Sequence, residues 1–343
     1  MSNSIRARYP EELLAVVPVL LGFRPEDSLI AVLLEPDTSR VICTVRIDIT
    51  TDTEEVLPLL VKVASRAKAR EMVLVFYTDT DLTQAALDLI ANLEPSDLVV
   101  RDALLVDGDR YWSLMCEDPE CCPPQGNPSP TSTSVLEAEQ ALCGHPTVAR
   151  SREEVAARFT PRPDLAPTRE DFRTAADLQR LPVQVRCDTA WECLSTLARS
   201  RPESDREVVS VVRAGLLVLI RDTLVRDYVL ASVAATDTDT ALALTDALVG
   251  LALTAPEGLR AVPAAAAAAV LAMTGTCPVG ARELLALGEG QSLATLVESA
   301  LDQALPPEQI REAFSQALLE IEHLISDDTH EVHSTSTVAG GAA

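Results

Sequence analysis

The fold of this chain is set by the stretch SLIAVLLEPDTSRVICTVRID, residues 28–48. It contains two runs rich in Val, Ile and Leu, Ser28–Leu34 and Val41–Asp48. Between them lies Glu35–Ser39, a segment of turn-forming residues with the length of a hairpin connection. Apolar β-branched runs around such a segment predict two strands. We therefore expect the N-terminal half of the chain to be built on a β-sheet.

The segments on both sides of these strands predict an α/β domain. Before them, apolar residues at helical spacing over 13–21 predict a helix, and Gly22 is placed to end it in the left-handed conformation. After them, we expect helices over about 53–69 and 80–93, and strands over 72–77, 103–106 and 110–115. Asp107-Gly108 predicts the turn before the last strand. This order predicts a mixed β-sheet of about five strands flanked by helices, with parallel crossovers in the middle and a hairpin at each end.

The second half of the chain predicts an all-α fold. Strand signals nearly vanish after the Pro-, Ser- and Thr-rich segment 127–134. Two Ser-x-x-Glu patterns, Ser151–Glu154 and Ser204–Glu207, fit the helix capping box. Apolar residues then recur at helical spacing over 174–199, 205–234, 238–254, 262–273, 278–287, 291–304 and 307–325. We expect a helical domain of short antiparallel helices.

A chain of 343 residues is too long for one ordinary compact domain. The predicted organisation has four parts. They are an α/β domain over residues 1–128, a connecting segment over 129–150, an all-helical domain over 151–325 and a disordered tail over 326–343.

Composition restricts the classes of partner. Asp and Glu outnumber Lys and Arg by 52 to 28, and a net charge of -24 repels phosphate backbones, so we expect no nucleic-acid partner. No segment has the ~18 uninterrupted apolar residues of a membrane-spanning helix, so we expect no membrane partner. Arg6 and Arg8 precede the apolar run 13–23 as in a signal peptide, but Pro18 interrupts that run. We therefore expect a cytoplasmic protein with reduced cysteines.

Two stretches carry a family resemblance. PEELLAVVPVLLGFRPEDSLIAVLL (Pro10–Leu34) and DGDRYWSLMCEDPECCPPQGNP (Asp107–Pro128) closely resemble the hallmarks of a large actinobacterial family, domain-of-unknown-function family 4192. The stretch 280–305 resembles the C-terminal helices of that family more loosely. The resemblance implies an N-terminal α/β part joined to a helical part. It implies no activity, and it carries over no catalytic residue.

The cysteines of the second stretch are candidate metal ligands. Cys116, Cys121 and Cys122 have the spacing C-x4-C-C, and Cys143 and His145 follow some twenty residues later. Structural zinc needs four ligands, usually in short-spaced pairs such as C-x2-C. The pair formed by Cys143 and His145 is one residue too tight for that spacing, and adjacent cysteines rarely bind the same ion. The zinc hypothesis therefore names Cys116, Cys121, Cys122 and His145, against the usual pattern.

Three other interpretations of these cysteines stay open. A disulfide between Cys116 and one of the adjacent pair is sterically conceivable, although a reducing compartment disfavours it. A reactive thiol is also conceivable, but Glu117, Asp118 and Glu120 should raise the thiol pKa values. In the purely structural interpretation, the cysteines are small apolar groups and the neighbouring prolines stiffen a turn that closes the domain.

Carboxylates at strand ends are the other candidate site. Asp48, Asp79 and Asp107 end the second, third and fourth predicted strands, so they should line the carboxyl edge of the sheet, where open α/β sheets bind ligands. The competing interpretation is that such residues cap helices, with Asp79 or Thr80 capping the helix after the third strand. The loop Gly22–Leu29 also has charged residues that could bind a ligand, although each of them has a local structural explanation.

The function hypotheses follow from these candidates. The common phosphate-binding, dinucleotide-binding, serine-hydrolase and zinc-protease motifs do not occur in the sequence. The leading hypothesis is a non-catalytic protein-interaction or regulatory module, whose helical domain presents grooves to a protein partner. The alternative is a small-molecule-binding protein or enzyme that uses the acidic sheet edge, with or without a divalent cation.

Overall fold

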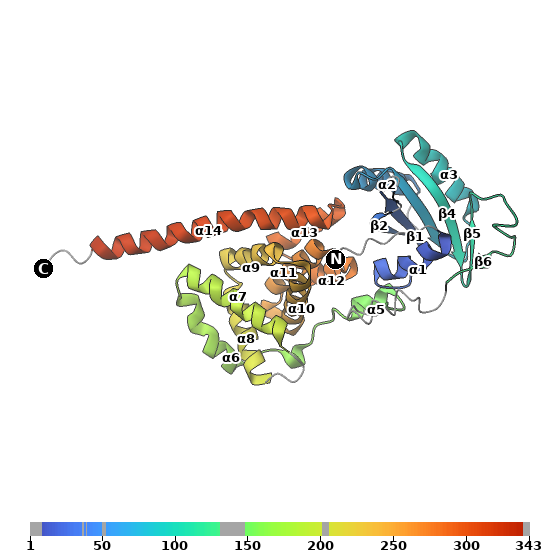
Figure 1. The fold of residues 1–343 in the computed structure, drawn as a ribbon. Coiled ribbons are helices and arrows are strands. Elements are labelled where there is room, and N and C mark those ends of the chain that lie inside the picture. Colours follow the sequence, from blue (N-terminus) through green and yellow to red (C-terminus); the bar gives the residue numbers. More distant parts are fainter. Residues whose placement is uncertain are drawn as a thin grey trace. The chain divides into compact units, whose positions relative to one another are not determined.

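The computed structural model describes residues 9–35, 38, 40–49, 53–130, 148–200 and 206–338. The chain divides into two compact units, Met1–Val155 and Ala156–Ala343 (Figure 1). The first unit contains the sheet, and the second is helical. The predicted outline, α/β followed by helices, is therefore confirmed.

The first unit is built on a six-stranded mixed sheet with strand order β2-β1-β3-β4-β5-β6. Its strands are β1 (Ser28–Leu34), β2 (Val41–Asp48), β3 (Glu71–Tyr77), β4 (Val99–Asp107), β5 (Arg110–Ser113) and β6 (Asn127–Pro128). β3 and β4 are parallel, and the other neighbouring pairs are antiparallel. The sixth strand was not predicted, because two residues are too few to show an alternating pattern.

Two helical crossovers connect strands that run in the same direction. Helix α2 (Thr53–Ala67) joins β2 to β3, which run in the same direction with β1 between them. Helix α3 (Thr83–Leu93) joins the parallel neighbours β3 and β4. The third helix, α1 (Pro10–Leu21), ends as predicted at Gly22, which has φ +79° and donates its amide to the Pro18 carbonyl at 2.9 Å.

The sheet is covered on both faces. Leu13, Leu14 and Val17 of α1 form a core cluster with Ile30 and Val32 of β1 and with apolar residues of β3, β4 and β5. The alternate residues of β1 point to the opposite face. On that side α2 contacts β1 and β2, and α3 contacts β4. All seven residues of β1 are buried, which explains why its sequence is apolar without alternation.

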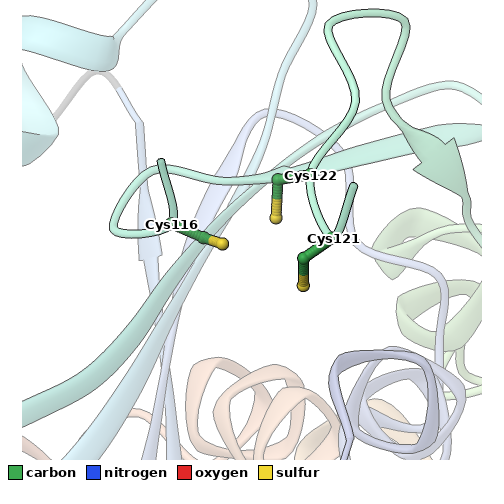
Figure 2. A group of neighbouring side chains, drawn as sticks. All are labelled: Cys116, Cys121 and Cys122. Atoms are coloured by element: carbon green, nitrogen blue, oxygen red, sulfur yellow. The ribbon is translucent and has the colours of Figure 1, made fainter. Parts of the chain in front are cut away.

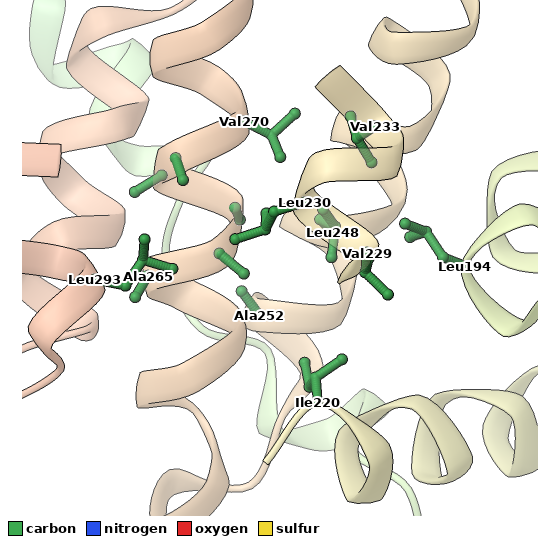
Figure 3. Close-up of a cluster of buried hydrophobic side chains, with 14 of the residues drawn as sticks. Leu194, Ile220, Val229, Leu230, Val233, Leu248, Ala252, Ala265, Val270 and Leu293 are labelled. Atoms are coloured by element: carbon green, nitrogen blue, oxygen red, sulfur yellow. The ribbon is translucent and has the colours of Figure 1, made fainter. Parts of the chain in front are cut away.

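The second unit is formed around helix α11 (Ala261–Thr274), whose residues from Pro263 to Met273 are all buried. The other helices are α6 (Arg169–Ala175), α7 (Val183–Arg199), α8 (Arg206–Leu219), α9 (Thr223–Ala235), α10 (Thr238–Thr254), α12 (Pro278–Leu287), α13 (Ser292–Asp302) and α14 (Pro307–Val338). Figure 3 shows the core that they share, with Leu230 of α9, Leu248 of α10, Ala265 of α11 and Leu293 of α13. The Ala-rich sequence of α11 lets its neighbours approach closely.

Several predicted helix boundaries were wrong. The segment 205–234 was predicted as one helix, but it is divided at Asp222, whose side chain accepts a 2.9 Å hydrogen bond from the Leu224 amide and starts α9. The segment 174–199 is divided where α7 begins after Pro182. Helix α14 has 32 residues, so it is not short, and it continues to Val338, beyond the predicted end at 325. Residues 339–343 lie outside the described part of the chain.

The two predicted capping boxes have different outcomes. Ser151 accepts a hydrogen bond from the Glu154 amide at 3.3 Å, before the short helix α5 (Arg152–Ala157), which is the first half of the predicted box. The Glu154 carboxylate accepts a hydrogen bond from the Arg150 amide at 2.8 Å, one residue before the position that the box predicts. Ser204 lies outside the described residues. Among the residues that the structure describes, no helix has the length and apolarity needed to cross a bilayer.

Candidate functional site

The structure places the three predicted carboxylates at one edge of the sheet. Asp48 is paired with Ser28 across β1 and β2, and Ser28 is paired with Tyr77 of β3. Asp79 follows Tyr77 by two residues, and Tyr77 is paired with Val106, the neighbour of Asp107. This edge is where the parallel strands β3 and β4 end. The role of these residues in binding a ligand stays a prediction.

Two of the three carboxylates line a cleft of about 420 Å³ at this edge. We call it the carboxyl-edge cleft. Its lining comes from four segments: the loop Arg24–Asp27, the end of β3 at Tyr77–Asp79, the hairpin Val106–Gly108, and Ser129 with Pro130, together with Leu14 and Pro18 of α1. Asp48 is not among these residues. Its carboxylate forms an ion pair with Arg46 at 2.8 Å, outside the cleft.

Asp79 is held at the cleft by the backbone that leaves β3. The Thr78 amide donates to the Val106 carbonyl at 3.1 Å, which continues the pairing of β3 with β4 beyond Tyr77. The buried Thr78 hydroxyl accepts a 3.1 Å hydrogen bond from the Thr80 amide. The next residue, Asp79, is exposed. These hydrogen bonds fix the turn and leave its side chain at the surface of the cleft.

Asp79 does not cap α3, so that prediction was wrong. The helix begins at Thr83, and Asp81 accepts a hydrogen bond from the Thr83 amide at 3.0 Å. This backbone hydrogen bond lowers the pKa of Asp81 below its ordinary value. Leu82 is the N-cap residue of the helix, and Asp81, immediately before it, provides the side-chain acceptor at this helix end. Helix capping therefore does not explain the presence of an aspartate at position 79.

The loop Arg24–Asp27 is fixed at both ends. The Arg24 amide donates to the Ala149 carbonyl at 3.0 Å, and the Ile49 amide donates to the Asp27 carbonyl at 3.1 Å. Pro25 is buried, whereas the side chains of Glu26 and Asp27 are exposed. The Ser28 hydroxyl donates to the Glu26 carbonyl at 2.5 Å, a local bond of the kind that the structural interpretation predicted. The same loop nevertheless lines the cleft.

The cleft combines hydrogen-bond acceptors with a few donors. The carboxylates are those of Glu26, Asp27, Asp79 and Asp107, and the cation is Arg24. Burial raises the pKa of Tyr77, so the phenol keeps its proton at neutral pH. Such a surface suits a ligand that offers several N–H or O–H donors.

The cysteine stretch forms a separate cluster. The sulfur atoms of Cys116, Cys121 and Cys122 all lie within 4.8 Å of one another, and Figure 2 shows the three side chains around one space. All three are free thiols in the structure. His145 and Cys143, the other residues considered for zinc, lie outside the described part of the chain.

The Cys121 and Cys122 thiols are not poised as nucleophiles. Burial, followed by a hydrogen bond with Cys116, raises the pKa of Cys122 to about 11. A hydrogen bond with Cys116 is also the main cause that raises the pKa of Cys121. The direction agrees with the prediction, but the cause differs, because only Asp118 among the neighbouring carboxylates contributes, and only to a small degree.

Comparison with known proteins decides the family. The profile of the family described as Domain of unknown function (DUF4192) matches residues 10–308. The chain belongs to the DUF4192 family. No curated protein and no solved structure matches it.

The DUF4192 match begins at the first residue of α1 and ends at the second residue of α14, so it includes both units. It also contains the carboxyl-edge cleft and the cysteine cluster. The sequence analysis considered the loop Gly22–Leu29, which contains Arg24, but it did not place this loop beside the strand ends, and it missed Tyr77 and Thr78 as cleft residues. The loop reaches the carboxyl edge because β1, which follows it, is antiparallel to β3.

Proposed function

We propose that the first unit of this DUF4192 chain binds a small polar ligand in the carboxyl-edge cleft. The observation that carries the proposal is the meeting of Arg24, Asp79 and Asp107, from three separate segments, around one cleft of about 420 Å³. The cleft lies at the ends of parallel strands, which is the usual ligand position in open α/β sheets. Its volume is also within the range of small-molecule sites, about 300–1,000 Å³.

The chemistry of the cleft indicates the class of ligand. Four carboxylates accept hydrogen bonds, so the ligand should carry several donors, as a sugar, another polyol or an amine does. Arg24 can bind an anionic or carbonyl group of the same molecule and so fix its orientation. Leu14, Pro18 and Val106 give the wall an apolar part for the carbon skeleton.

A thermal-shift screen with sugars, amines, amino acids and nucleotides, each with and without Mg²⁺, tests the proposal. The best ligand is then titrated by calorimetry. We expect Asp79→Asn combined with Asp107→Asn to weaken binding at least about tenfold, because hydrogen bonds to charged groups contribute about 1.5–3 kcal/mol each.

Asp48→Asn is the matched control, because Asp48 lies at the same edge but outside the cleft. It should leave the affinity unchanged. Equal affinity of the double variant and the wild type would remove the cleft as the binding site. An equal loss in the control would show that only the general negative charge matters.

The outer face of α14 supports a second candidate, a partner-binding role for the helical unit. Ile310, Ile321 and Ile325 are buried against the core, whereas Leu319 and Leu324 have exposed fractions of 74% and 57%. Glu320 lies between the two leucines on the helix surface. Exposed apolar side chains beside a carboxylate suit a basic amphipathic helix from another protein.

A pull-down from the native host with wild type and with Leu319→Asp plus Leu324→Asp tests this candidate. The supporting result is a stoichiometric partner that cross-links to α14 through a basic amphipathic segment and is lost from the variant. Val185→Asp, at an exposed position of α7, is the control. Equal capture by both variants would contradict the role of α14.

A further inference from the structure

The cysteine cluster lies apart from the carboxyl-edge cleft. Strand β5 runs opposite to β4 and carries the chain away from Asp107, with Ser113 paired to Leu104. Met115 is then found beside Glu71 and Val99, which begin β3 and β4 at the other edge of the sheet. Cys116 follows Met115. The thiols are therefore not part of the cleft.

The backbone of the cysteine stretch is fixed by hydrogen bonds that do not involve the thiols. The Cys122 amide donates to the Asp118 carbonyl at 2.7 Å, and the Glu120 amide donates to the Asp118 carboxylate at 2.9 Å. The Asn127 side-chain amide donates to the Cys121 carbonyl at 2.8 Å. Asn127 is itself paired with Tyr111 through β6 and β5. The segment between β5 and β6, which carries the three sulfurs, is thus tied to the sheet.

A second set of contacts closes the turn. The Trp112 indole N–H donates to the Pro124 carbonyl at 3.1 Å, and the Gly126 amide donates to the Pro123 carbonyl at 2.8 Å. These contacts support the predicted domain-closing turn. They do not explain why three sulfurs meet, because none of these bonds uses a thiol.

The distances suit a metal ion. A zinc ion with zinc–sulfur bonds of about 2.3 Å in tetrahedral geometry needs its thiolates about 3.8 Å apart. The three sulfurs lie within 4.8 Å of one another, so side-chain rotations of modest size would complete this geometry. Cys121 is exposed, which leaves an entry path for an ion. Glu117 and Glu120 are also exposed and make the surroundings negative.

We propose that Cys116, Cys121 and Cys122 form a three-thiolate site for a soft divalent cation of the zinc type. The ion is bound by Cys116, three residues after β5, and by the adjacent pair Cys121 and Cys122 later in the same connection to β6. Water or an external ligand takes the fourth position. The site connects the end of β5 to the segment that returns to form β6, so it stabilises this closing turn. The proposal does not depend on ligand binding in the cleft.

Zinc titration of the full chain under a phosphine reductant tests the proposal. Competition with a chromophoric chelator gives the affinity and stoichiometry, and Co²⁺ in place of Zn²⁺ reports thiolate ligands by charge-transfer absorption. We expect one equivalent of metal. We expect Cys116→Ser, Cys121→Ser and Cys122→Ser each to weaken binding more than about tenfold, since even outer-shell changes have effects of that size.

Cys43→Ser, in strand β2, is the matched control and should bind zinc as the wild type does. Cys121 is exposed, so Cys121→Ser tests the site without disturbing the core, and circular dichroism verifies the fold. Binding that is unchanged in the three variants would overturn the proposal. So would the absence of thiolate-to-cobalt absorption. The proposal would also be overturned by a disulfide between Cys116 and either Cys121 or Cys122, if the reduced protein then bound no metal.

Discussion

Gly126 shows how one residue holds the cysteine stretch in place. Its φ of +74° lies in the left-handed region, and a Cβ there would meet the Trp112 ring at 2.6 Å. The sequence predicts a stiff turn from Pro123 and Pro124, but it cannot predict the contact with Trp112. That contact depends on the return of the chain as β6, a strand of two residues that has no sequence pattern of its own.

Gly126→Ala should therefore destabilise the first unit by more than the backbone conformation alone requires. Gly108→Ala is the matched comparison, because Gly108 has φ +57° and no atom within 4 Å of an added Cβ. We expect about 1–2 kcal/mol for Gly108→Ala, from the left-handed conformation. For Gly126→Ala we expect about 1–3 kcal/mol more, from overpacking. Urea unfolding measures both, and equal losses would contradict the contact.

At the scale of elements, Asp171 connects two helices through a capping box. Its carboxylate accepts hydrogen bonds from the Thr168 amide at 2.7 Å, at the start of α6, and from the Ser210 hydroxyl of α8 at 2.8 Å. The Thr168 backbone hydrogen bond, followed by those of the two hydroxyls, lowers the pKa of Asp171. The folded state thus favours the ionised form.

Asp171→Asn should accordingly show a pH-dependent effect. A carboxylate whose pKa is lowered by folding stabilises the fold at pH values above its unfolded-state pKa. This stabilisation is lost as the pH falls through its folded-state pKa. We expect a loss of about 1 kcal/mol at pH 7, typical of a lost cap. The difference should shrink as the pH falls below about 4, where Asp171 of the unfolded chain becomes protonated first, and its pH-dependent part should be lost below the lowered pKa of the folded state. Unfolding at several pH values tests this, with the exposed Asp164→Asn as control. A pH-independent difference would contradict it.

The packing of α11 gives a second prediction at this scale. Ala265 is 1% exposed, and an added Cβ on Gly288 would lie 3.0 Å from its amide nitrogen. Ala265→Leu should therefore overpack the core and cost about 1–3 kcal/mol. Ala313→Leu, at an exposed position of α14, should change stability by less than about 0.5 kcal/mol. Thermal unfolding compares them, and equal effects would contradict the close approach.

The elements also show what the sequence could predict. Apolar runs and Gly22 located β1, β2 and α1 correctly, because burial and the left-handed cap leave local patterns. The division of 205–234 at Asp222 was missed, since the apolar spacing continues across it. The meeting of Asp79 with Arg24 was also missed. It depends on the direction of β1 relative to β3, which pairs residues far apart in sequence.

At the scale of the molecule, each unit has its own core and its own tryptophan. Trp112 lies on β5 of the first unit and Trp191 on α7 of the second. Leu104 belongs to the first core and Leu230 to the second, and both are fully buried. The two cores share no residue among those described. We therefore expect the two units to unfold in separate transitions and not in one cooperative step.

Tryptophan variants test this independence. In a Trp191→Phe background, fluorescence reports the first unit, and in a Trp112→Phe background it reports the second. Leu104→Ala should lower the free energy of unfolding by about 2–5 kcal/mol when Trp112 fluorescence is followed, and should leave it unchanged when Trp191 fluorescence is followed. Leu230→Ala should have the opposite pattern, with the loss seen only through Trp191. Equal shifts of both signals would show that the chain unfolds as one cooperative unit.

The most direct test of the carboxyl-edge cleft is a crystal structure of the chain with the tightest ligand from the screen. We expect a molecule between the loop Arg24–Asp27 and the strand ends, with its donors on Asp79 and Asp107. A ligand bound in the helical unit, or at the sheet without contact to either carboxylate, would contradict it.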